Sequence, residues 1–375
     1  MNIAYVYLWD VVGDPSAPDR LAALGVDAIA LAASYHSTRA ATPYHPSHRV
    51  LDVPYPAFYL PVRKSAWARL VPASPTWTPA DAYLQARDAL KAAGLKVHAW
   101  TVLTHNSHLG AANPDLTVRN AFNDPYPYAL CPAHDDVLDY CDRLVREILT
   151  VAAPDGLILE ACGPMGFSHL SVHEKTSGAD WTAVDSDLLS VCFCASCAPR
   201  YPAPTKARVR AALDRTLSTS GFLTMEEALG PLADEVRTTR VALSTALRKR
   251  LLATTREIAP NIPIALHANP SPWATGAFAA LPSGDPAADV LVASCWGDPT
   301  EDASRLTHLT TLTTPAQRVG AYVLALPPRP ADASVLADHL RTYAKAGATD
   351  FHLYHAGLAS PARLTALTEA LRRLT

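Results

Sequence analysis

The sequence predicts an α/β protein, a (β/α)8 barrel of the TIM type, with residues 1–375 forming one domain. Eight short apolar runs occur along the chain, and a stretch with helical character follows nearly every run. Such runs are typical of parallel strands buried on both faces, and strands alternating with helices indicate βαβ units. The expected strands are Ile3–Leu8, Ala28–Ala32, Val97–Val102, Gly156–Leu159, Ile264–Leu266, Val290–Ala293, Val319–Leu326 and Phe351–Leu353.

Polar or aromatic residues stand directly after each of these runs, which is the third sign of a barrel. In this fold the active site lies at the carboxyl ends of the strands. The helices are expected at Pro18–Leu24, Pro79–Ala93, His134–Val151, Lys206–Leu217, Met225–Ile258, Thr300–Thr313, Ala333–Ala346 and Pro361–Leu374. Thr78 is a plausible N-cap for the second of these helices, and Gly94 ends it.

Two long insertions interrupt the alternation, one after strand two (about Thr38 to Thr78) and one after strand four (Gly163 to about Pro204). A long loop inside a compact domain is usually functional. The second insertion begins Gly163-Pro-Met-Gly166-Phe, close behind strand four, and we expect this segment to form a tight loop over the site.

Composition excludes several classes of partner. A net charge of −3 with both signs mixed gives no basic stripe, so nucleic acid is not an expected ligand. No apolar run reaches the ~20 residues that span a membrane, and the N-terminus lacks the pattern of a secretory signal. We therefore expect a soluble cytoplasmic protein that acts on a small molecule, and a homo-oligomer is compatible with this composition.

Cysteines form the most specific local motif. Three of the seven, Cys192, Cys194 and Cys197, lie within six residues as CxCxxC in the second insertion. Four thiolates in tetrahedral geometry suit Zn²⁺, and Cys131 is our choice for the fourth ligand of a structural zinc. The alternative is a set of reduced thiols buried as small apolar side chains; a disulfide is disfavoured in a reducing compartment.

The segment from Cys131-Pro-Ala-His-Asp through a strand ending in Glu160 to CxCxxC resembles the zinc-bearing β-galactosidases of glycoside hydrolase family 42. The resemblance covers Cys131 to Cys197 and implies a distant relative among glycosidase-like (β/α)8 barrels. It implies zinc on the four cysteines and an acid/base role for Glu160. Two features depart from the family: Leu159 stands where the family has Asn, and strand seven, Val319–Leu326, carries no carboxylate where the family has its nucleophile.

Glu160 is also the strongest catalytic candidate on its own residue pattern. It ends the apolar segment Asp155–Glu160, where burying a lone carboxylate is costly, so we expect it to face the barrel mouth. Burial there would raise its pKa toward the range of a general acid. The alternative is a structural carboxylate paired with an arginine or with backbone donors.

Glycosidic cleavage normally uses two carboxylates, and the second is not evident. Asp298, after strand six, is the tentative partner of Glu160; Asp10, after strand one, and Glu174, in the second insertion, are the other candidates. Asp298 precedes Pro299, and such a pair is equally typical of a helix N-cap followed by the first turn.

Histidines, asparagines and aromatic residues at the strand ends predict a pocket for a ligand with many hydroxyls. Aromatic faces suit the C–H surfaces of sugars, although Trp100 is expected to pack inside the barrel. The expected ligand-binding residues are Trp9, Tyr35, His36, His105, Asn106, His267, Asn269, Trp296, Tyr354 and His355. Further histidines stand in nearby loops at positions 45, 48, 108, 169 and 173.

These features together predict a glycoside hydrolase-like enzyme that acts on a carbohydrate or glycoside, with Glu160 as general acid/base. Two alternatives remain open. A barrel without the second carboxylate is what a non-catalytic sugar-binding protein would show. Strand-end histidines can also bind a catalytic metal, as in metal-dependent hydrolases built on barrels.

Overall fold

A computed structural model describes residues 1–168, 174–216, 221–281 and 288–374. Leu217, His169 and His173 therefore lie outside the described residues. In the described ranges, no helix is both long enough and apolar enough to cross a membrane.

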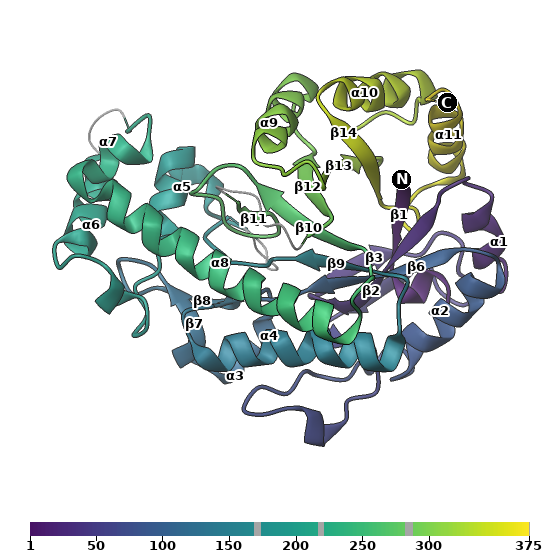
Figure 1. Cartoon of the computed structure of the whole chain (residues 1–375), viewed down its shortest axis with the longest axis horizontal. Helices are drawn as coiled ribbons and strands as arrows, with labels where there is room; N and C mark the ends of the chain where they lie inside the picture. The colour runs from purple at the N-terminus through teal and green to yellow at the C-terminus, as the bar shows by residue number, and fades with distance from the viewer. Residues whose placement is uncertain (169–173, 217–220, 282–287, 375) are drawn as a thin grey trace.

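Eight parallel strands form a closed barrel, because the first strand pairs with both the second and the last (Figure 1). This confirms the predicted TIM-barrel fold. The barrel strands are β1 (Asn2–Val6), β2 (Ala28–Tyr35), β6 (Lys96–Val102), β9 (Gly156–Glu160), β10 (Ile264–Asn269), β12 (Val290–Cys295), β13 (Arg318–Leu324) and β14 (Ala348–Tyr354). Each contains all or most of one predicted run.

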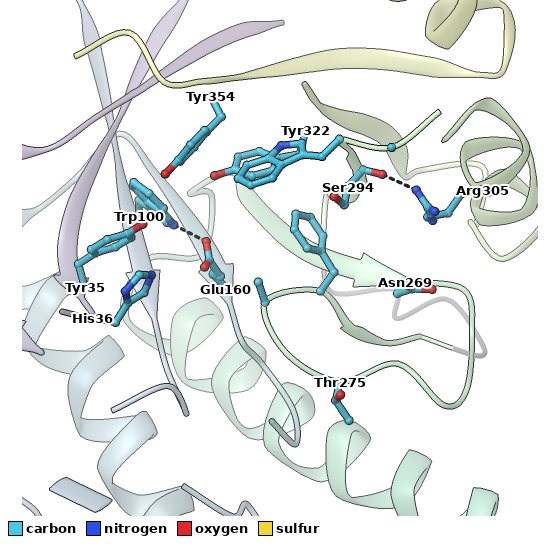
Figure 2. Close-up of a pocket in the computed structure, with 14 residues that line it drawn as sticks. Tyr35, His36, Trp100, Glu160, Asn269, Thr275, Ser294, Arg305, Tyr322 and Tyr354 are labelled. Carbon is cyan, nitrogen blue, oxygen red and sulfur yellow. Dashed lines mark hydrogen bonds between the residues drawn. The ribbon is translucent and has the colours of Figure 1, made fainter. Parts of the chain in front are cut away.

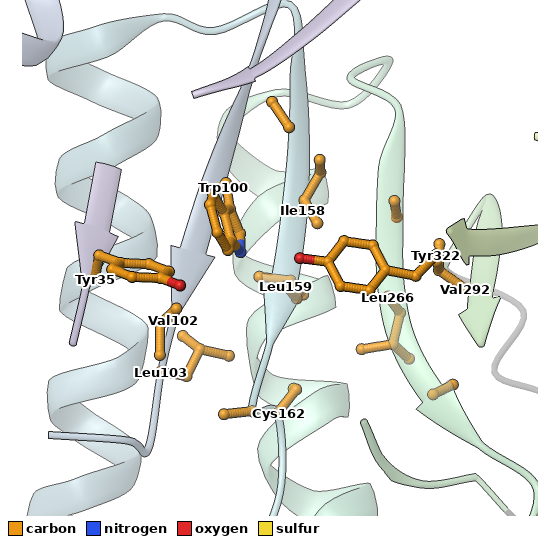
Figure 3. Packing of buried hydrophobic residues seen from close by; sticks show 14 of the residues in the cluster. Tyr35, Trp100, Val102, Leu103, Ile158, Leu159, Cys162, Leu266, Val292 and Tyr322 are labelled. Carbon is orange, nitrogen blue, oxygen red and sulfur yellow. The ribbon is translucent and has the colours of Figure 1, made fainter. Parts of the chain in front are cut away.

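Large aromatic side chains fill the barrel interior. The ring of Tyr5 on β1 lies 4.9 Å from the rings of both Trp100 on β6 and Tyr322 on β13, in edge-on contact. Figure 3 shows Trp100 and Tyr322 directed toward each other from their strands. Gly320 on β13 has no room for a larger side chain, because an added Cβ would lie 3.0 Å from Val292. The interior is thus a packed core, as is usual for this fold.

Helices cover the outside of the barrel near the predicted positions (Figure 1). They are α1 (Ala17–Ala22), α2 (Ala82–Ala92), α4 (Asp135–Glu147, continued by a π turn over Ile148–Ala152), α8 (Ala233–Ile258), α9 (Pro299–Thr311), α10 (Ala333–Lys345) and α11 (Pro361–Arg372). Two more helices, α6 (Thr205–Thr216) and α7 (Met225–Leu229), lie beyond the end of α8, away from the barrel strands (Figure 1).

Two helix predictions need correction. The helix expected from Pro79 begins at Ala82 with Asp81 as its N-cap, because the Ala82 amide bonds to the Pro79 carbonyl in a preceding turn. The helix expected over Met225–Ile258 is broken into α7 and α8. Gly230 has a left-handed φ of 57° at the break, and the following proline cannot donate a backbone hydrogen bond.

The insertions are more ordered than the sequence indicates. The first holds the hairpin of β3 (Thr38–Ala41) and β4 (Val50–Val53), and its β5 (Ala57–Phe58) pairs with β2. The second holds α5 (Ala183–Leu189), and α6 follows it.

A further insertion, between β6 and α4, was not predicted. It contains α3 (Ser107–Ala112) and a hairpin of β7 (Thr117–Arg119) with β8 (Pro125–Leu130). Pro125 and Pro127 hide β8 in the sequence, since proline inside a run argues against a strand unless the strand is at an edge.

Candidate active site and metal centre

Glu160 is the last residue of β9 and lies at the barrel mouth, flanked by β6 and β10. Its side chain is only 7% exposed. The indole Nε1 of Trp100 donates a hydrogen bond of 2.7 Å to Oε2 (Figure 2), and Nδ1 of His267 lies 3.4 Å from the same oxygen. Burial raises the pKa of Glu160 to about 7, although the Trp100 hydrogen bond lowers it. A carboxyl with this pKa can hold or release a proton near neutral pH.

A cavity of about 570 Å³ opens above Glu160. Among the described residues that line it, Glu160 is the one carboxylate and Arg305 the one residue with a permanent positive charge. The lining residues are Tyr35, His36, Trp100, Glu160, Asn269, Thr275, Ala277, Phe278, Ser294, Trp296, Gly297, Arg305, Tyr322 and Tyr354. A concave site of this size, largely aromatic with a few polar groups, is typical of small-molecule binding.

Aromatic rings form one wall of this cavity. Trp296 stacks on Tyr322 with the ring centroids 5.5 Å apart and the planes 13° apart, and its centroid lies 4.8 Å from that of Tyr354. Trp296 is 41% exposed, so the rest of its face is open to a ligand. Trp100 is buried in the barrel as expected, and only its indole edge reaches Glu160.

Tyr322 is a tyrosine of the cavity lining that the sequence analysis missed, and Tyr7 contacts two lining tyrosines that it predicted. The hydroxyl of Tyr7 donates to that of Tyr35 at 3.1 Å and lies 3.4 Å from that of Tyr354. Tyr322 lies on β13, the strand that carries the nucleophile in family 42. A signal was present for Tyr5 and Tyr7, because they are two residues apart in the predicted strand Ile3–Leu8, where alternation places them on one face; in the structure Tyr7 directly follows β1.

Asp298, the tentative second carboxylate, does not line this cavity. It is the N-cap of α9, where its side chain accepts hydrogen bonds from the amides of Thr300 (2.8 Å) and Glu301 (3.3 Å). These backbone bonds lower its pKa, and the residue is exposed. The geometry is that of the helix cap that the sequence left open as the alternative.

Asp10 and Glu174, the other two candidates, also lie outside the lining. Asp10 is buried, accepts a 2.8 Å hydrogen bond from the Tyr7 amide, and lines a separate small cavity beside Arg20. Burial raises its pKa to about 7. Glu174 is exposed and accepts hydrogen bonds from the neighbouring amides of Lys175 and Thr176. The structure thus brings none of the three to Glu160.

The strand-end histidines do not converge on one point. His36 lines the cavity, and its ring lies 4.5 Å from that of His105. His267 stacks on Phe278 below the cavity floor, and His355 is buried against Tyr7. Burial lowers the pKa of His267 and of His355 to about 3, so both rings are neutral.

Three other predicted ligand-binding residues have identifiable structural contacts. Trp9 is buried and stacks on Tyr7. Asn106 is the N-cap of α3, since its side chain accepts from the Leu109 amide. Asn269 lines the cavity, while its side-chain oxygen accepts from the Ser271 amide.

The four predicted cysteines form one buried cluster, and all their sulfurs lie within 4.8 Å of one another. The Sγ of Cys131 is 3.5 Å from that of Cys197, 3.8 Å from that of Cys192 and 3.7 Å from that of Cys194. A tetrahedron of sulfurs around zinc, with bonds of about 2.3 Å, has edges of about 3.8 Å. The donor set and its spacing therefore fit a closed tetrahedral site.

This cluster joins the insertion between β6 and α4 to the second insertion, which follows β9. The amide of Phe193 donates to the Arg119 carbonyl at 2.6 Å, and the Tyr128 hydroxyl donates to the Gly166 carbonyl at 2.8 Å. An added Cβ at Gly166 would lie 2.4 Å from the hydroxyl oxygens of Ser190 and Thr275. The loop after Glu160 is thus held tightly between the β7–β8 hairpin and the cavity rim.

Comparisons with known proteins give the fold without a family assignment from sequence. No family model matches the chain, and no curated protein matches it. Among solved structures, all of this chain aligns with the catalytic domain of β-amylase from Paenibacillus polymyxa, with a TM-score of 0.57, 13% identity and 98% of that domain covered. All of it also aligns with β-galactosidase from the psychrophilic Marinomonas ef1 (TM-score 0.56, 12% identity, 59% of that chain).

The family 42 β-galactosidase Gan42B from G. stearothermophilus aligns over the whole of this chain as well, with a TM-score of 0.53, 9% identity and 56% of its own length covered. The chain thus spans little more than half of the galactosidases it matches. It is a distant structural relative of family 42 β-galactosidases and of other glycosidase barrels. That confirms the resemblance as one of fold.

Proposed function

We propose that this protein binds a carbohydrate or glycoside in the cavity at the barrel mouth and hydrolyses a glycosidic bond with Glu160 as the general acid. The observation that carries this proposal is a nearly buried carboxyl with a pKa near 7, placed at the carboxyl end of β9 in a cavity with an aromatic wall. Catalytic carboxyls in barrels of this kind lie at strand ends.

In this mechanism the sugar ring lies against the open face of Trp296. Protonated Glu160 donates its proton to the glycosidic oxygen as the bond to C1 breaks, and the resulting carboxylate accepts the hydrogen bond from Trp100. His36 and Asn269 are in the lining and can hydrogen-bond sugar hydroxyls. Because the described lining offers no second carboxylate, a group of the substrate itself attacks C1, as in the substrate-assisted exceptions to the two-carboxylate rule. Water then opens this intermediate, and the Glu160 carboxylate takes the proton that the water loses.

The cysteine cluster takes a structural role in this proposal. Cys131, Cys192, Cys194 and Cys197 would hold one zinc ion. Four sulfur ligands leave no open coordination position, so the bound metal supplies a cross-link between the insertions.

A screen of aryl glycosides in both anomeric forms tests the proposal, with Glu160→Gln as the matched variant. The variant keeps the size of the side chain and the Trp100 contact but cannot supply the proton. We expect turnover to fall by about 10²–10⁴-fold with sugar binding retained. Substrates with good leaving groups should lose less, because they need less protonation. If the variant lost turnover by the same factor on substrates with poor and with good leaving groups, the acid role would be contradicted.

A second candidate, a sugar-binding barrel without catalysis, is favoured by one observation: the described lining holds a single carboxylate. Calorimetry that detects sugar binding by wild-type protein in the absence of any cleavage would support it.

The metal-dependent hydrolase has less support. Among the described residues, the only group of histidine, cysteine or acidic side chains close enough to share a metal is the cysteine cluster. Esterase or amidase activity on adding divalent metal, without sugar binding, would revive it.

A further inference from the structure

A row of buried polar groups runs from Glu160 through the barrel core. The hydroxyl of Tyr5 lies 3.1 Å from Nε2 of His267 and 2.9 Å from Nδ1 of His352. The other nitrogen of His267, Nδ1, lies 3.4 Å from Oε2 of Glu160 without a hydrogen bond in this conformation. The four side chains come from β1, β10, β14 and β9, and none of these residues is more than 5% exposed. The polar atoms of Tyr5 and His267 depend on their neighbours, because both side chains are fully buried below the cavity.

Hydrogen counting leaves two arrangements for this row. A tyrosine hydroxyl has one hydrogen, and a neutral imidazole has one N–H and one acceptor nitrogen. If Tyr5 donates to Nε2 of His267, that ring carries its hydrogen on Nδ1 and directs it at Oε2, while His352 donates to the Tyr5 oxygen. If Tyr5 donates to His352 instead, His267 donates from Nε2 and turns a bare Nδ1 toward Oε2.

The two arrangements have opposite effects on Glu160. Trp100 Nε1 is a donor only, so Oε2 already accepts one hydrogen bond. With hydrogen on Nδ1 of His267, Oε2 faces a second donor. With a bare Nδ1 and an ionised Glu160, two acceptor atoms, Nδ1 and Oε2, face each other. Both have lost hydration, and neither gains a hydrogen bond from the other to offset that loss. A neutral Glu160 avoids this repulsion if its proton lies on Oε2 and is shared in a hydrogen bond with Nδ1 of His267. The proton is then not available to a substrate.

We propose that Tyr5 and His352 are positioning residues that hold His267 in the Nδ1–H tautomer, so that this N–H, rather than a bare nitrogen, faces Oε2 beside the Trp100 donor and Oε1 carries the acid proton of Glu160. This deepens the proposed acid role of Glu160 and rests on it. When the Oε1–H bond breaks and the glycosidic oxygen takes the proton, the negative charge left on the carboxylate meets the Trp100 donor already in place. The N–H of His267 lies 3.4 Å away, so a small shift brings it into a hydrogen bond with the charged form.

Neighbouring titratable groups leave this arrangement undisturbed at neutral pH. Burial raises the pKa of Tyr5, Tyr35 and Tyr322 well above the usual value, and it raises the pKa of Tyr354 as well. All four hydroxyls therefore stay protonated at neutral pH. Burial also holds the pKa of His352 well below its usual value, and His267, His98, the N-terminus and Arg318 act in the same direction. The groups that face Glu160 and His267 from the surrounding strands are Tyr5, Tyr35, Tyr322, His352 and Tyr354.

Nitrogen NMR of the wild-type protein, labelled at histidine with ¹⁵N, tests the tautomer directly. The His267 signals are assigned by their loss in His267→Gln. We expect Nδ1 to carry the hydrogen and Nε2 to be bare from about pH 5 to about pH 8, across the range in which an ordinary histidine titrates. A hydrogen on Nε2, or a ring that protonates in this range, overturns the proposal.

Tyr5→Phe tests the cause, with Tyr83→Phe as the matched control. Both tyrosines are fully buried, but Tyr83 lies on α2, outside the barrel interior. In Tyr5→Phe we expect the His267 signals to shift toward the Nε2–H form. The pKa of Glu160, followed by the infrared band of its carboxyl group, should rise by about one to two units, the size of one lost hydrogen bond to a charge.

Tyr83→Phe should keep the wild-type tautomer and pKa, and an unchanged His267 in Tyr5→Phe would contradict the proposal. If Tyr5→Phe does not fold, the wild-type spectrum still decides. Neither measurement needs a substrate. A protein with the Nδ1–H tautomer that cleaves no glycoside would therefore refute the proposed function alone, and a glycosidase with the Nε2–H tautomer would refute this inference alone.

Discussion

At the scale of single residues, the cost of burial explains why Glu160 is unlike the other candidate acids. Its carboxyl has one firm donor, Trp100, and loses most of its hydration, so the neutral form is favoured. Asp298 has two backbone donors and stays in water, so its pKa moves the other way. Position relative to solvent separates a potential acid from a helix cap, although both follow a strand.

Glu160→Gln should increase stability at neutral pH. The pKa of Glu160 in the folded protein, about 7, lies above the ordinary value of 4.5, so wild-type protein loses stability as pH rises from about 4.5 to about 7. The loss is on the order of 3 kcal/mol at 1.36 kcal/mol per pKa unit. Denaturant unfolding should show the variant and wild type alike near pH 4, and the variant more stable near pH 8.

Glu174→Gln is the control for the direction in which stability changes with pH. Hydrogen bonds from Thr176 and Lys175 lower the pKa of exposed Glu174, so any stability that it contributes is present at neutral pH and lost as pH falls. A gain of stability at pH 8 in both variants would show that the effect does not come from the burial of Glu160.

Trp296→Ala should weaken sugar binding with little effect on folding, because the ring is 41% exposed and forms one wall of the cavity. An aromatic contact contributes about 0.5–1.5 kcal/mol, so calorimetry should give an affinity about 2- to 10-fold lower. Trp181→Ala is the matched control, since Trp181 is 37% exposed and does not line the cavity. Equal losses in both variants would contradict a sugar face at Trp296.

At the scale of elements, helix starts and strand ends give the candidate residues their roles. Asp298 begins α9 and Asn106 begins α3, and each bonds the amide hydrogens of its own first turn. The parallel register places Trp100 on β6 level with Ile158, two residues before Glu160 on the same face of β9, and His267 on β10 one residue past the Leu266–Leu159 pair. The same chemical group thus closes a helix in one place and faces a cavity in another.

Asp298→Ala should lower the free energy of unfolding by about 1 kcal/mol through loss of the N-cap. Asp298→Asn separates the cap from a catalytic carboxylate, since asparagine caps a helix as well as aspartate does but cannot act as base or nucleophile. We expect Asp298→Asn to keep both stability and glycoside turnover. Normal stability with turnover abolished would instead restore Asp298 as the second carboxylate.

At the scale of the whole molecule, the insertions are held together separately from the barrel. The cysteine cluster links the segment after β8 to the second insertion, and Tyr128 links the same hairpin to the loop behind Glu160. The barrel itself closes through backbone pairing of β1 with β14 and β2 and through its aromatic core. The packing of the two insertions therefore depends on the cluster more than the barrel does.

Purified protein should contain about one zinc per chain by elemental analysis. Removing it with a chelator, or by Cys194→Ser, should increase hydrogen exchange in residues 117–130 and 163–204 while the barrel strands stay protected, because the metal joins only these segments. Cys141→Ser is the control, since Cys141 is equally buried but lies outside the cluster. Exchange that rises uniformly over the chain, or protein without zinc that shows wild-type protection, would contradict the structural role.

The sequence by itself determined the barrel, the position of Glu160 at the barrel mouth and the cysteine cluster. Continuous apolar runs such as Gly156–Leu159 fit only a sheet that is covered on both faces, and the residue after such a run must lie at the mouth. CxCxxC places three thiols close together locally, and Cys131, directly after β8, completes the cluster.

Only the tertiary structure decided which strand-end residues meet. Asp10, Asp298 and His355 follow strands just as Glu160 does, but the turn after each strand directs its side chain to a cap or into the core. Tyr5, Tyr322 and His352 lie inside apolar runs, where they read as core, yet the closed barrel brings Tyr5 into contact with His267 and His352 across strands distant in sequence. Such contacts depend on barrel closure and side-chain packing, which local sequence patterns do not encode.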